Sequence, residues 1–433
     1  MGSSEWYTLL KEIENLKSYD AIKDIVPGYE LFDFQCVDLL KIMHTKKQVL
    51  CYETGMGKTL MAGAMINAVR HIKPNAKFIV FVLKSQLGQT PSKLKEYTGL
   101  NITYLTSEQD MIYKKMVAKD FIHSDILILT HECLNSQKVM SMLFAARAYY
   151  TGIIVDEIHN VANFHKATSS FMLFNVMNAF EYCLSLTATP ITTDVKKAAQ
   201  IMYMTNRDSV YDLNNASETL QQDGISVYHD VVTVRTRKEL GIITNYKVNV
   251  VKVKPLAHQI GANGIDMFNV TKGEGAVNQI KALIKTIKDY PEYYKGLIYI
   301  RHHEIRKFVV EELEKAGINC GVINGLTSLN KRAELCKEFN ENRLNLIITS
   351  ITESLDLDCE YIIFYEFDIS MQQMLGRGNR GLNPKQLDLN IFFTEKTGEA
   401  DYFIRNIYAR SLMFQTVMGT ELSYIKEMAN EIL

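Results

Sequence analysis

The stretch Tyr52-Glu53-Thr54-Gly55-Met56-Gly57-Lys58-Thr59 lies where an apolar run, residues 49–52, gives way to a helical pattern that begins at Leu60. A strand, a glycine turn and a helix start in this order predict a phosphate-binding loop, because the glycines permit a tight turn and the helix N-terminus attracts negative charge. In such a loop Lys58 reaches the β- and γ-phosphates of a nucleotide, and Thr59 binds Mg²⁺.

The loop departs from the full pattern at Tyr52, where the pattern has glycine, and by itself the turn could simply cap a helix. A second motif, Ile153-Ile154-Val155-Asp156-Glu157-Ile158-His159, follows further along the chain. An apolar strand that ends in two adjacent carboxylates places Asp156 on Mg²⁺ and leaves Glu157 to orient or deprotonate water. The two motifs together indicate ATP hydrolysis.

The length and composition of the chain set broad limits. A chain of 433 residues exceeds what one hydrophobic core usually serves, so two domains are expected. With 47% hydrophobic and 22% charged residues, the composition is that of an ordinary globular protein. The net charge of −1 gives the whole molecule no attraction to nucleic acid. Any binding site for a polyanion must therefore be a local patch.

The seven cysteines include no C-x-x-C pair, and several stand within apolar runs. This pattern favours buried thiols in a reducing compartment over disulfides or a zinc site. The longest strand-like apolar run, residues 78–83, is too short to cross a bilayer, and the start Met1-Gly2-Ser3-Ser4-Glu5 does not resemble a signal peptide. We therefore expect an intracellular protein, in the cytoplasm or at the nucleoid or nucleus, with no membrane partner.

Polar residues follow the predicted strands of the first half. Apolar runs at residues 78–83, 126–129 and 153–155 predict buried parallel strands. Lys84-Ser85-Gln86 follows the first of them, and Thr130-His131-Glu132 follows the second. Ligands of a doubly wound sheet bind at this edge, so Lys84, Ser85 and Thr130 are suited to contacts with a phosphate backbone. The alternative is that they are polar loop residues in water.

Three shorter features add detail. Gln35 precedes the phosphate loop, and its amide could bond an adenine edge, although an exposed helix residue is the alternative. The stretch Leu184-Ser185-Leu186-Thr187-Ala188-Thr189-Pro190 ends a strand in hydroxyl groups, where a nucleotide site could touch a neighbouring domain. The stretch Val234-Arg235-Thr236-Arg237-Lys238-Glu239-Leu240-Gly241 concentrates positive charge, which usually marks a solvated face.

The second half repeats the α/β pattern from near Val248 onward. Its predicted strands are the apolar runs 297–300, 321–323, 346–348 and 361–364, and helical patterns at 305–315 and 331–340 lie between them. Two α/β halves joined by an irregular connector are therefore predicted. We place the N-terminal domain with its connector at residues 1–245 and the C-terminal domain at residues 246–433.

Late in the second half stands Gln373-Met374-Leu375-Gly376-Arg377-Gly378-Asn379-Arg380-Gly381. Arg377 and Arg380 share one face of a helix, so both could point across an interdomain cleft at the same triphosphate. An arginine supplied in this way is worth roughly 10³–10⁵ in rate. The alternative is a pair of surface arginines.

Several of these stretches resemble the motifs of a known superfamily. Motifs one, two, three and six of the superfamily-two helicases are similar to residues 53–59, Asp156-Glu157-Ile158-His159, Thr187-Ala188-Thr189 and residues 373–380. Within that superfamily the chain resembles the Swi/Snf-type translocases and their compact viral or phage relatives. Three weaker likenesses to that branch are residues 29–35, 234–240 and 296–339. The fifth motif departs from the family pattern, because the stretch Ser350-Ile351-Thr352-Glu353-Ser354-Leu355-Asp356-Leu357 has serine where a glycine is usual shortly before the Leu-Asp pair.

The resemblance implies an α/β fold of two tandem RecA-like parallel-sheet domains, with ATP and Mg²⁺ in the interdomain cleft. It implies that Gln35, Gln373 and the loop from Glu53 to Thr59 bind the nucleotide, and that Thr59 and Asp156 hold the metal. Duplex DNA would cross both domains at the sheet edges. The residues expected to hold it are Lys84, Ser85, Thr130, Arg301, Thr349 and Thr352. His159 and Thr187 are the candidates for linking nucleotide state to the grip on DNA.

The expected function is that of an ATP-driven motor that translocates on or remodels duplex DNA. One alternative keeps the enzyme and changes the substrate, as a strand-separating DNA helicase or an RNA helicase. Another is a scaffold that binds nucleotide without turnover, which the intact Glu157 and Arg380 disfavour. A transport or protein-remodelling ATPase is a third, and it offers no reason for residues 373–380 in a second domain.

Overall fold

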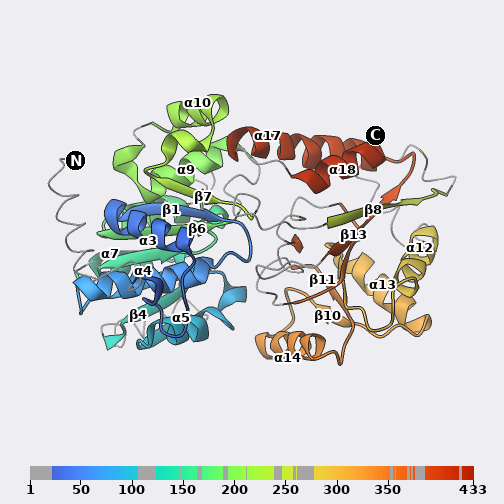
Figure 1. The fold of residues 1–433 in the computed structure, drawn as a ribbon, viewed down its shortest axis with the longest axis horizontal. Helices are drawn as coiled ribbons and strands as arrows, with labels where there is room; N and C mark the ends of the chain where they lie inside the picture. The colour runs from blue at the N-terminus through green and yellow to red at the C-terminus, as the bar shows by residue number, and fades with distance from the viewer. Residues whose placement is uncertain are drawn as a thin grey trace. The chain divides into compact units, whose positions relative to one another are not determined.

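The computed structural model describes the residues in the following ranges: 22–105, 123–146, 148–162, 168–188, 194–210, 212–237, 246–256, 260, 277–351, 355, 357–367, 371, 374–375, 386–418 and 422–433. The chain separates into two compact units, Met1–Arg235 and Thr236–Leu433 (Figure 1). The expected domain boundary after residue 245 falls at the end of the undescribed stretch 238–245 and stays a prediction.

The first unit is built on a parallel sheet of seven strands in its described part, in the order β3-β4-β2-β5-β6-β1-β7. The strands are β1 (Lys47–Tyr52), β2 (Phe78–Val82), β3 (Ile102–Leu105), β4 (Ile126–Thr130), β5 (Gly152–Val155), β6 (Tyr182–Thr187) and β7 (Val232–Arg235). The central strands are buried on both faces, which explains their unbroken apolar runs. All strands end at the same edge, so the segments that follow them gather there.

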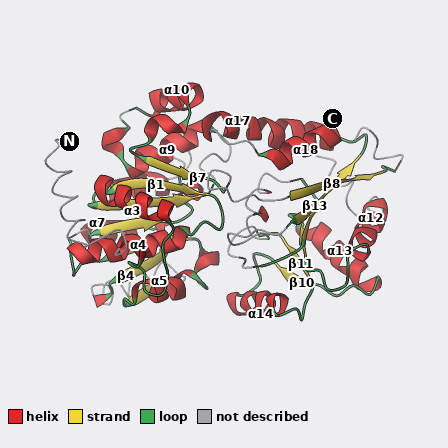
Figure 2. Ribbon diagram, viewed as in Figure 1, coloured by secondary structure: helices red, strands yellow, loops and turns green. Residues whose placement is uncertain are grey.

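Helices pack around this sheet (Figure 2). They are α3 (Asp33–Thr45), α4 (Lys58–Ile72), α5 (Thr90–Thr98), α7 (Gln137–Ala146), α8 (Thr168–Met177), α9 (Val195–Thr205) and α10 (Leu213–Asp223). Short 3₁₀ turns follow strands or helices at η1 (Lys84–Gln86), η3 (His131–Asn135), η4 (Ile158–Asn160), η5 (Arg207–Ser209) and η6 (Ile225–Tyr228). Helix α10 is mostly polar, yet it forms because the Asp212 side chain accepts hydrogen bonds from its first-turn N–H groups.

The second unit contains another parallel sheet, in the order β10-β11-β9-β12-β13-β8. Its strands are β8 (Tyr246–Val253), β9 (Gly296–Tyr299), β10 (Gly321–Ile323), β11 (Leu346–Thr349), β12 (Tyr361–Phe364) and β13 (Leu387–Thr394). Its helices are α12 (Val277–Lys288), α13 (His303–Lys315), α14 (Leu329–Asn340), α16 (Glu399–Tyr402), the π-helix η9 (Phe403–Tyr408), α17 (Ala409–Met418) and α18 (Ser423–Ile432). The prediction of two parallel-sheet α/β halves is confirmed.

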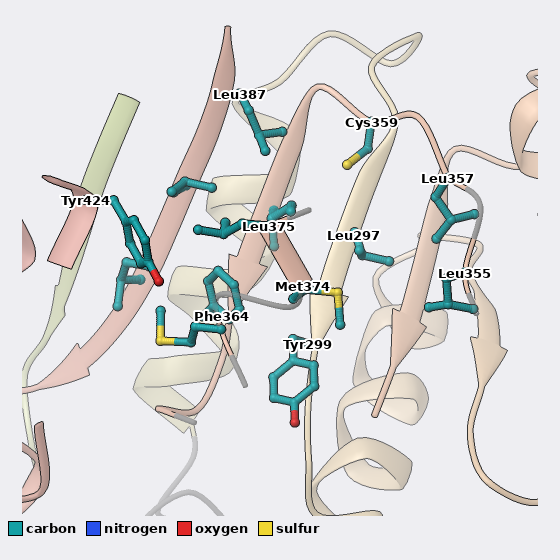
Figure 3. Packing of buried hydrophobic residues seen from close by; sticks show 14 of the residues in the cluster. Leu297, Tyr299, Leu355, Leu357, Cys359, Phe364, Met374, Leu375, Leu387 and Tyr424 are labelled. Atoms are coloured by element: carbon teal, nitrogen blue, oxygen red, sulfur yellow. The ribbon is translucent and has the colours of Figure 1, made fainter. Parts of the chain in front are cut away.

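Both faces of the second sheet are covered. Leu297 and Tyr299 of β9 contribute to one core cluster, together with Phe364, Met374 and Leu387 (Figure 3). The intervening side chains, such as Ile298, belong to a second cluster on the opposite face. This division follows from the two-residue period of a strand.

All seven cysteines are free thiols, and each is buried except Cys320, which is partly buried. Burial raises the pKa of the Cys51 and Cys183 thiols to about 12, so both are neutral and unreactive.

Within the described ranges, no helix combines the length and the apolar character that a membrane crossing would need.

Candidate nucleotide site

The phosphate-binding loop connects the end of β1 to the start of α4, as the sequence predicts. Gly55 and Gly57 have φ angles of 86° and 87°, in the left-handed region that favours glycine. Space is also limited at Gly57, where an added Cβ would lie 2.7 Å from Nε2 of Gln35. The turn therefore requires glycine at this position, and a Cβ would also push against the Gln35 amide of α3. The loop presents backbone N–H groups at a helix N-terminus, which suits phosphate oxygens.

Lys58 lies within the loop. Its Nζ donates a hydrogen bond of 3.1 Å to the main-chain carbonyl of Tyr52, which brings the ammonium group back across the turn. The same charge acts to lower the pKa of Asp156, so the lysine and the carboxylate are electrostatic neighbours. This position suits a cation that binds phosphate.

Asp156 follows β5 directly and is buried, with 7% of its surface exposed. Its Oδ1 accepts a hydrogen bond of 2.9 Å from the Glu157 N–H, and its Oδ2 accepts one of 2.9 Å from Nε2 of Gln86. Burial, followed by the charge of Glu157, raises the pKa of Asp156 to about 6, while Lys58 acts in the opposite direction. A carboxylate has about four acceptor positions, so two remain for a cation. The hydroxyl of Thr59 and this carboxylate are the hard oxygen donors that Mg²⁺ prefers, and the donor set fits the ion.

Glu157 adopts a left-handed conformation, with φ 47°. A non-glycine residue in this region is strained, and such residues often lie at functional sites. The left-handed conformation of Glu157 turns the chain sharply between the end of β5 and the start of η4. Oε2 of Glu157 lies 3.4 Å from Nδ1 of His159. The structure therefore keeps the second carboxylate inside the site.

His159 and Thr187 are in contact. Nδ1 of His159 lies 2.9 Å from Oγ1 of Thr187, the last residue of β6. Burial lowers the pKa of His159, which favours a neutral ring. The two predicted coupling residues thus meet beside Glu157, and the contact joins the ends of neighbouring strands β5 and β6.

Tyr52, which replaces the first glycine of the full loop pattern, has a structural role. Its hydroxyl donates a hydrogen bond of 2.7 Å to Oδ2 of Asp38, a residue of α3 that is 1% exposed. Arg235, at the end of β7, donates to both oxygens of Asp38, at 2.9 Å and 2.6 Å. The main-chain carbonyl of Arg235 also accepts from the Glu53 N–H at 3.1 Å. The departure from the pattern therefore ties the loop to α3 and β7.

The positive stretch that contains Arg235 is not a solvated face in its described part. Arg235 holds Asp38, and Arg237 is only 3% exposed. The expectation of a solvated face is wrong at these two positions, because one guanidinium serves a buried acid and the other is itself buried. Residues 238–241 lie outside the described set.

Gln35 is buried, so the alternative of an exposed helix residue is wrong. Its Oε1 accepts a hydrogen bond of 3.0 Å from the Phe32 N–H, and its Nε2 donates one of 3.1 Å to the Met56 carbonyl. An amide offers two donors and two acceptor positions, so these bonds leave capacity at each end. Gln35 lies against the phosphate loop, and its expected contact with adenine stays a prediction.

The candidates for nucleic-acid contact gather at the strand ends of each unit. Lys84 is exposed and precedes Ser85 in η1, after β2, and Thr130 ends the neighbouring β4. Thr130 is buried, with its hydroxyl 3.6 Å from the Cys133 thiol. Lys84 and Ser85 are thus better placed for a direct contact than Thr130.

In the second unit, Arg301 is exposed just after β9, and Thr349 ends the neighbouring β11. The Thr349 hydroxyl is buried and bonds to the backbone of Ile351 at 3.1 Å, so it supports the following loop. The remaining predicted site residues, Thr352, Gln373, Arg377 and Arg380, lie outside the described residues.

Three residues at the site were missed by the sequence reasoning. Gln86 bonds Asp156, Asp38 holds Tyr52, and His131 is buried near the Asp156 backbone. Burial lowers the pKa of His131 to about 4, so its ring is neutral at pH 7. Gln86 and His131 had a signal, since each lies within three residues of a predicted strand end. Asp38 had none, because it is one polar position among many in a helix.

The fold and the site define a class of protein. A phosphate loop and a pair of strand-end carboxylates on one parallel sheet, followed by a second parallel sheet, describe a P-loop ATPase with two tandem RecA-like domains. Comparisons with known families narrow this class. Residues 12–192 match the family described as Type III restriction enzyme, res subunit, and residues 278–384 match the Helicase conserved C-terminal domain. The chain is a helicase-like ATPase of superfamily two.

No curated protein sequence gives a significant match. Among solved structures, the chain is similar to the Sulfolobus solfataricus SWI2/SNF2 ATPase core in complex with dsDNA, with a TM-score of 0.42 and 15% sequence identity, over 93% of this chain and 97% of that chain.

Proposed function

We propose that this protein is an ATP-driven motor that hydrolyses ATP to translocate on duplex DNA or to remodel it. The observation that carries the proposal is the convergence of three elements at one sheet edge: the phosphate loop, the Asp156-Glu157 pair and the Lys84-Ser85 turn. A nucleotide and a nucleic-acid backbone would thus be bound by neighbouring strand ends. The matched families are named for a restriction enzyme and a helicase, two kinds of protein that act on nucleic acid.

The nucleotide would be held by the loop of the first unit. Lys58 would exchange its bond to the Tyr52 carbonyl for phosphate oxygens, and the N–H groups of residues 55–58 would cradle the same phosphates. Thr59 and Asp156 would hold Mg²⁺, which when bound neutralises charge on the β- and γ-phosphates. Gln35 would bond the adenine edge.

Glu157 would orient the attacking water and accept its proton at a carboxylate oxygen. The neutral His159 lies 3.4 Å from that carboxylate and 2.9 Å from the hydroxyl of Thr187. This arrangement supports a role for His159 and Thr187 in linking the nucleotide state to the rest of the molecule. Arg377 and Arg380 of the second unit would stabilise charge in the transition state, with Gln373 beside the nucleotide.

Duplex DNA would be held along the strand ends of both units. Lys84 and Ser85 are the first-unit contacts, with Thr130 behind them, and Arg301, Thr349 and Thr352 are those of the second. Alternation between nucleotide states moves such a motor if each state grips the duplex differently. A protein with this substrate works inside the cell, in the cytoplasm or at the nucleoid or nucleus.

The proposal is tested by ATPase assays without nucleic acid and with duplex DNA, single strands, forks or RNA, each over a salt series. We expect the strongest stimulation by duplex DNA and a steep loss with salt, because contacts to a phosphate backbone release counterions. Displacement of a short strand would assign the protein to the strand-separating helicases instead. Turnover at background under every condition would favour the scaffold.

A matched pair of lysine variants tests the site. Lys58→Ala removes the loop lysine, whereas Lys73→Ala removes a surface lysine just after the end of α4, where it pairs with Glu181. We expect Lys58→Ala to abolish stimulated turnover and Lys73→Ala to preserve it. Full stimulated turnover in Lys58→Ala would refute the site assignment.

A further inference from the structure

Gln86 makes two hydrogen bonds that connect neighbouring strand ends. Its Oε1 accepts from the Leu83 N–H at 2.9 Å, and its Nε2 donates to Oδ2 of Asp156 at 2.9 Å. The Gln86 N–H also donates to the Leu83 carbonyl at 2.8 Å. The side chain therefore closes its own turn, η1, and reaches the carboxylate that follows β5.

These bonds fix the orientation of Asp156. The carboxylate is buried, and its other oxygen is held by the Glu157 N–H. With a donor on each oxygen, rotation of the carboxylate would break a hydrogen bond in a buried place, which is unfavourable. Partners of this kind set the direction from which a ligand carboxylate meets a metal ion, and their removal typically costs 10–100-fold in metal affinity.

The turn that carries Gln86 also carries Lys84 and Ser85. Two hydrogen bonds between Leu83 and Gln86 close this turn around Lys84 and Ser85. A displacement of Lys84 or Ser85 would therefore also move Gln86. Lys84 is exposed, whereas the Gln86 amide lies against the buried acid. A polyanion that pulls on Lys84 or Ser85 would thus change the position of the amide on Asp156.

We propose that Gln86 is a positioning residue that couples the nucleic-acid contact of η1 to the Mg²⁺ site through Asp156. This rests on the proposed function, in which η1 contacts DNA and Asp156 holds the metal. Coupling between two sites is reciprocal, so Mg²⁺-nucleotide should change DNA affinity by the same factor by which DNA changes nucleotide affinity. Such factors typically lie at about 5–150-fold.

Binding experiments on the full chain test the proposal without relying on turnover. The affinity for a short fluorescent duplex is measured with no nucleotide, with ATPγS and Mg²⁺, and with ATPγS and EDTA. Three variants are compared with the wild type. Gln86→Glu keeps an acceptor for the Leu83 N–H but places a carboxylate against Asp156. Gln86→Leu removes both bonds, and Gln89→Leu is the control three residues further on.

We expect nucleotide-free DNA affinity to stay near the wild-type value in Gln86→Glu, which keeps the acceptor that closes η1, and in Gln89→Leu. In Gln86→Glu and Gln86→Leu, the ratio of DNA affinities with and without Mg²⁺-nucleotide should approach one. The Mg²⁺ concentration needed for half-maximal nucleotide binding should rise by about 10–100-fold in the same two variants. Gln89→Leu should retain both wild-type values. Should Gln86→Leu fail to fold, Gln86→Glu still decides the matter.

The outcomes separate this inference from the proposed function. A wild-type chain that binds no DNA, or whose DNA affinity ignores nucleotide, would contradict the proposed function itself. A coupled wild type together with an equally coupled Gln86→Glu variant would overturn only the role of Gln86.

Discussion

At the scale of single residues, Gly57 meets two demands at once. It needs a φ of 87°, and it has no room for a Cβ beside the Gln35 amide. Gly99, the C-cap of α5, has a φ of 68°, but an added Cβ there meets no atom within 4 Å. A substitution at Gly99 therefore tests backbone strain alone, whereas one at Gly57 tests strain together with crowding.

We predict that Gly99→Ala costs about 1–2 kcal/mol of unfolding free energy, because an L-residue is strained in the left-handed region, and leaves nucleotide affinity unchanged. Gly57→Ala should cost more and should lower turnover on the order of 10²-fold, because the Cβ would push the Gln35 amide off the Met56 carbonyl, a bond that holds the loop. Urea unfolding and nucleotide titrations measure both effects. Equal nucleotide affinity in the two variants would contradict the crowding at Gly57.

Much of the site at this scale could be predicted from the sequence. The loop and the carboxylate pair follow from motifs whose chemistry demands particular residue types at strand ends. His159 and Thr187 were named from the sequence as coupling residues, but their contact was not predicted. The partners that support the site could not be predicted, because Gln86 bonds Asp156 and Asp38 bonds Tyr52 across different elements. A sequence gives the period of a helix or strand, whereas such contacts depend on which strands become neighbours.

At the scale of elements, two strands of the second sheet, β8 and β13, were not predicted from the sequence, and β13 shows why. Its polar residues Asp388 and Asn390 interrupt the apolar run, and both bond the hydroxyl of Tyr290, at 3.2 Å and 2.9 Å. The strand is stable because a distant tyrosine satisfies these groups, which no local pattern reveals. By contrast, the predicted strands at residues 346–348 and 361–364 are confirmed, because they are continuous apolar runs.

The junction of β13 and α16 contains a buried acid, Glu399. It accepts a hydrogen bond from the Thr394 N–H, and burial raises the pKa of its carboxyl to about 8. Between the ordinary pKa of glutamate, about 4.3, and this value, the folded state binds more protons than the unfolded state. The stabilisation is therefore complete below that window and is lost as the pH rises through it.

We predict that Glu399→Gln flattens this pH dependence, because an amide keeps the acceptor for Thr394 and cannot ionise. Denaturant unfolding of the wild type and the variant between about pH 5 and pH 9 should show a difference in stability that grows with pH and reaches a few kcal/mol. Glu395→Gln, a change at a neighbouring carboxyl outside the core, should behave like the wild type. A constant difference between wild type and Glu399→Gln across the range would contradict the buried ionisation.

At the scale of the whole molecule, the two units have separate sheets and cores, and the proposed motor needs residues from both. Residues 12–192 and 278–384 match different families, one in each unit. Binding of ATP would rest on the first unit, whereas efficient hydrolysis would need the arginines of the second. The sequence could predict this division of roles, since each motif is local to one half of the chain.

We predict that Arg377→Ala and Arg380→Ala retain nucleotide affinity within a few-fold and lower turnover by about 10³–10⁵-fold, because an arginine of this kind acts on the transition state. Arg343→Ala, which removes an exposed arginine paired with Glu341 in the same unit, is the control and should keep full turnover. Steady-state ATPase rates and nucleotide titrations measure the two quantities. Wild-type turnover in both Arg377→Ala and Arg380→Ala would argue against a composite site.

The hydrogen bonds of Arg235 determine where the first unit can be separated from the second without disturbing the phosphate-binding loop. The residue closes the first unit, yet its carbonyl anchors Glu53 and its guanidinium neutralises Asp38. A first unit that ends at residue 234 would leave Asp38 buried without its counter-ion. It would also remove the acceptor of the Glu53 N–H, which holds one side of the phosphate-binding loop. An isolated first unit should therefore include Arg235. We expect a fragment that ends before Arg235 to bind ATP more weakly than a fragment that ends just after it.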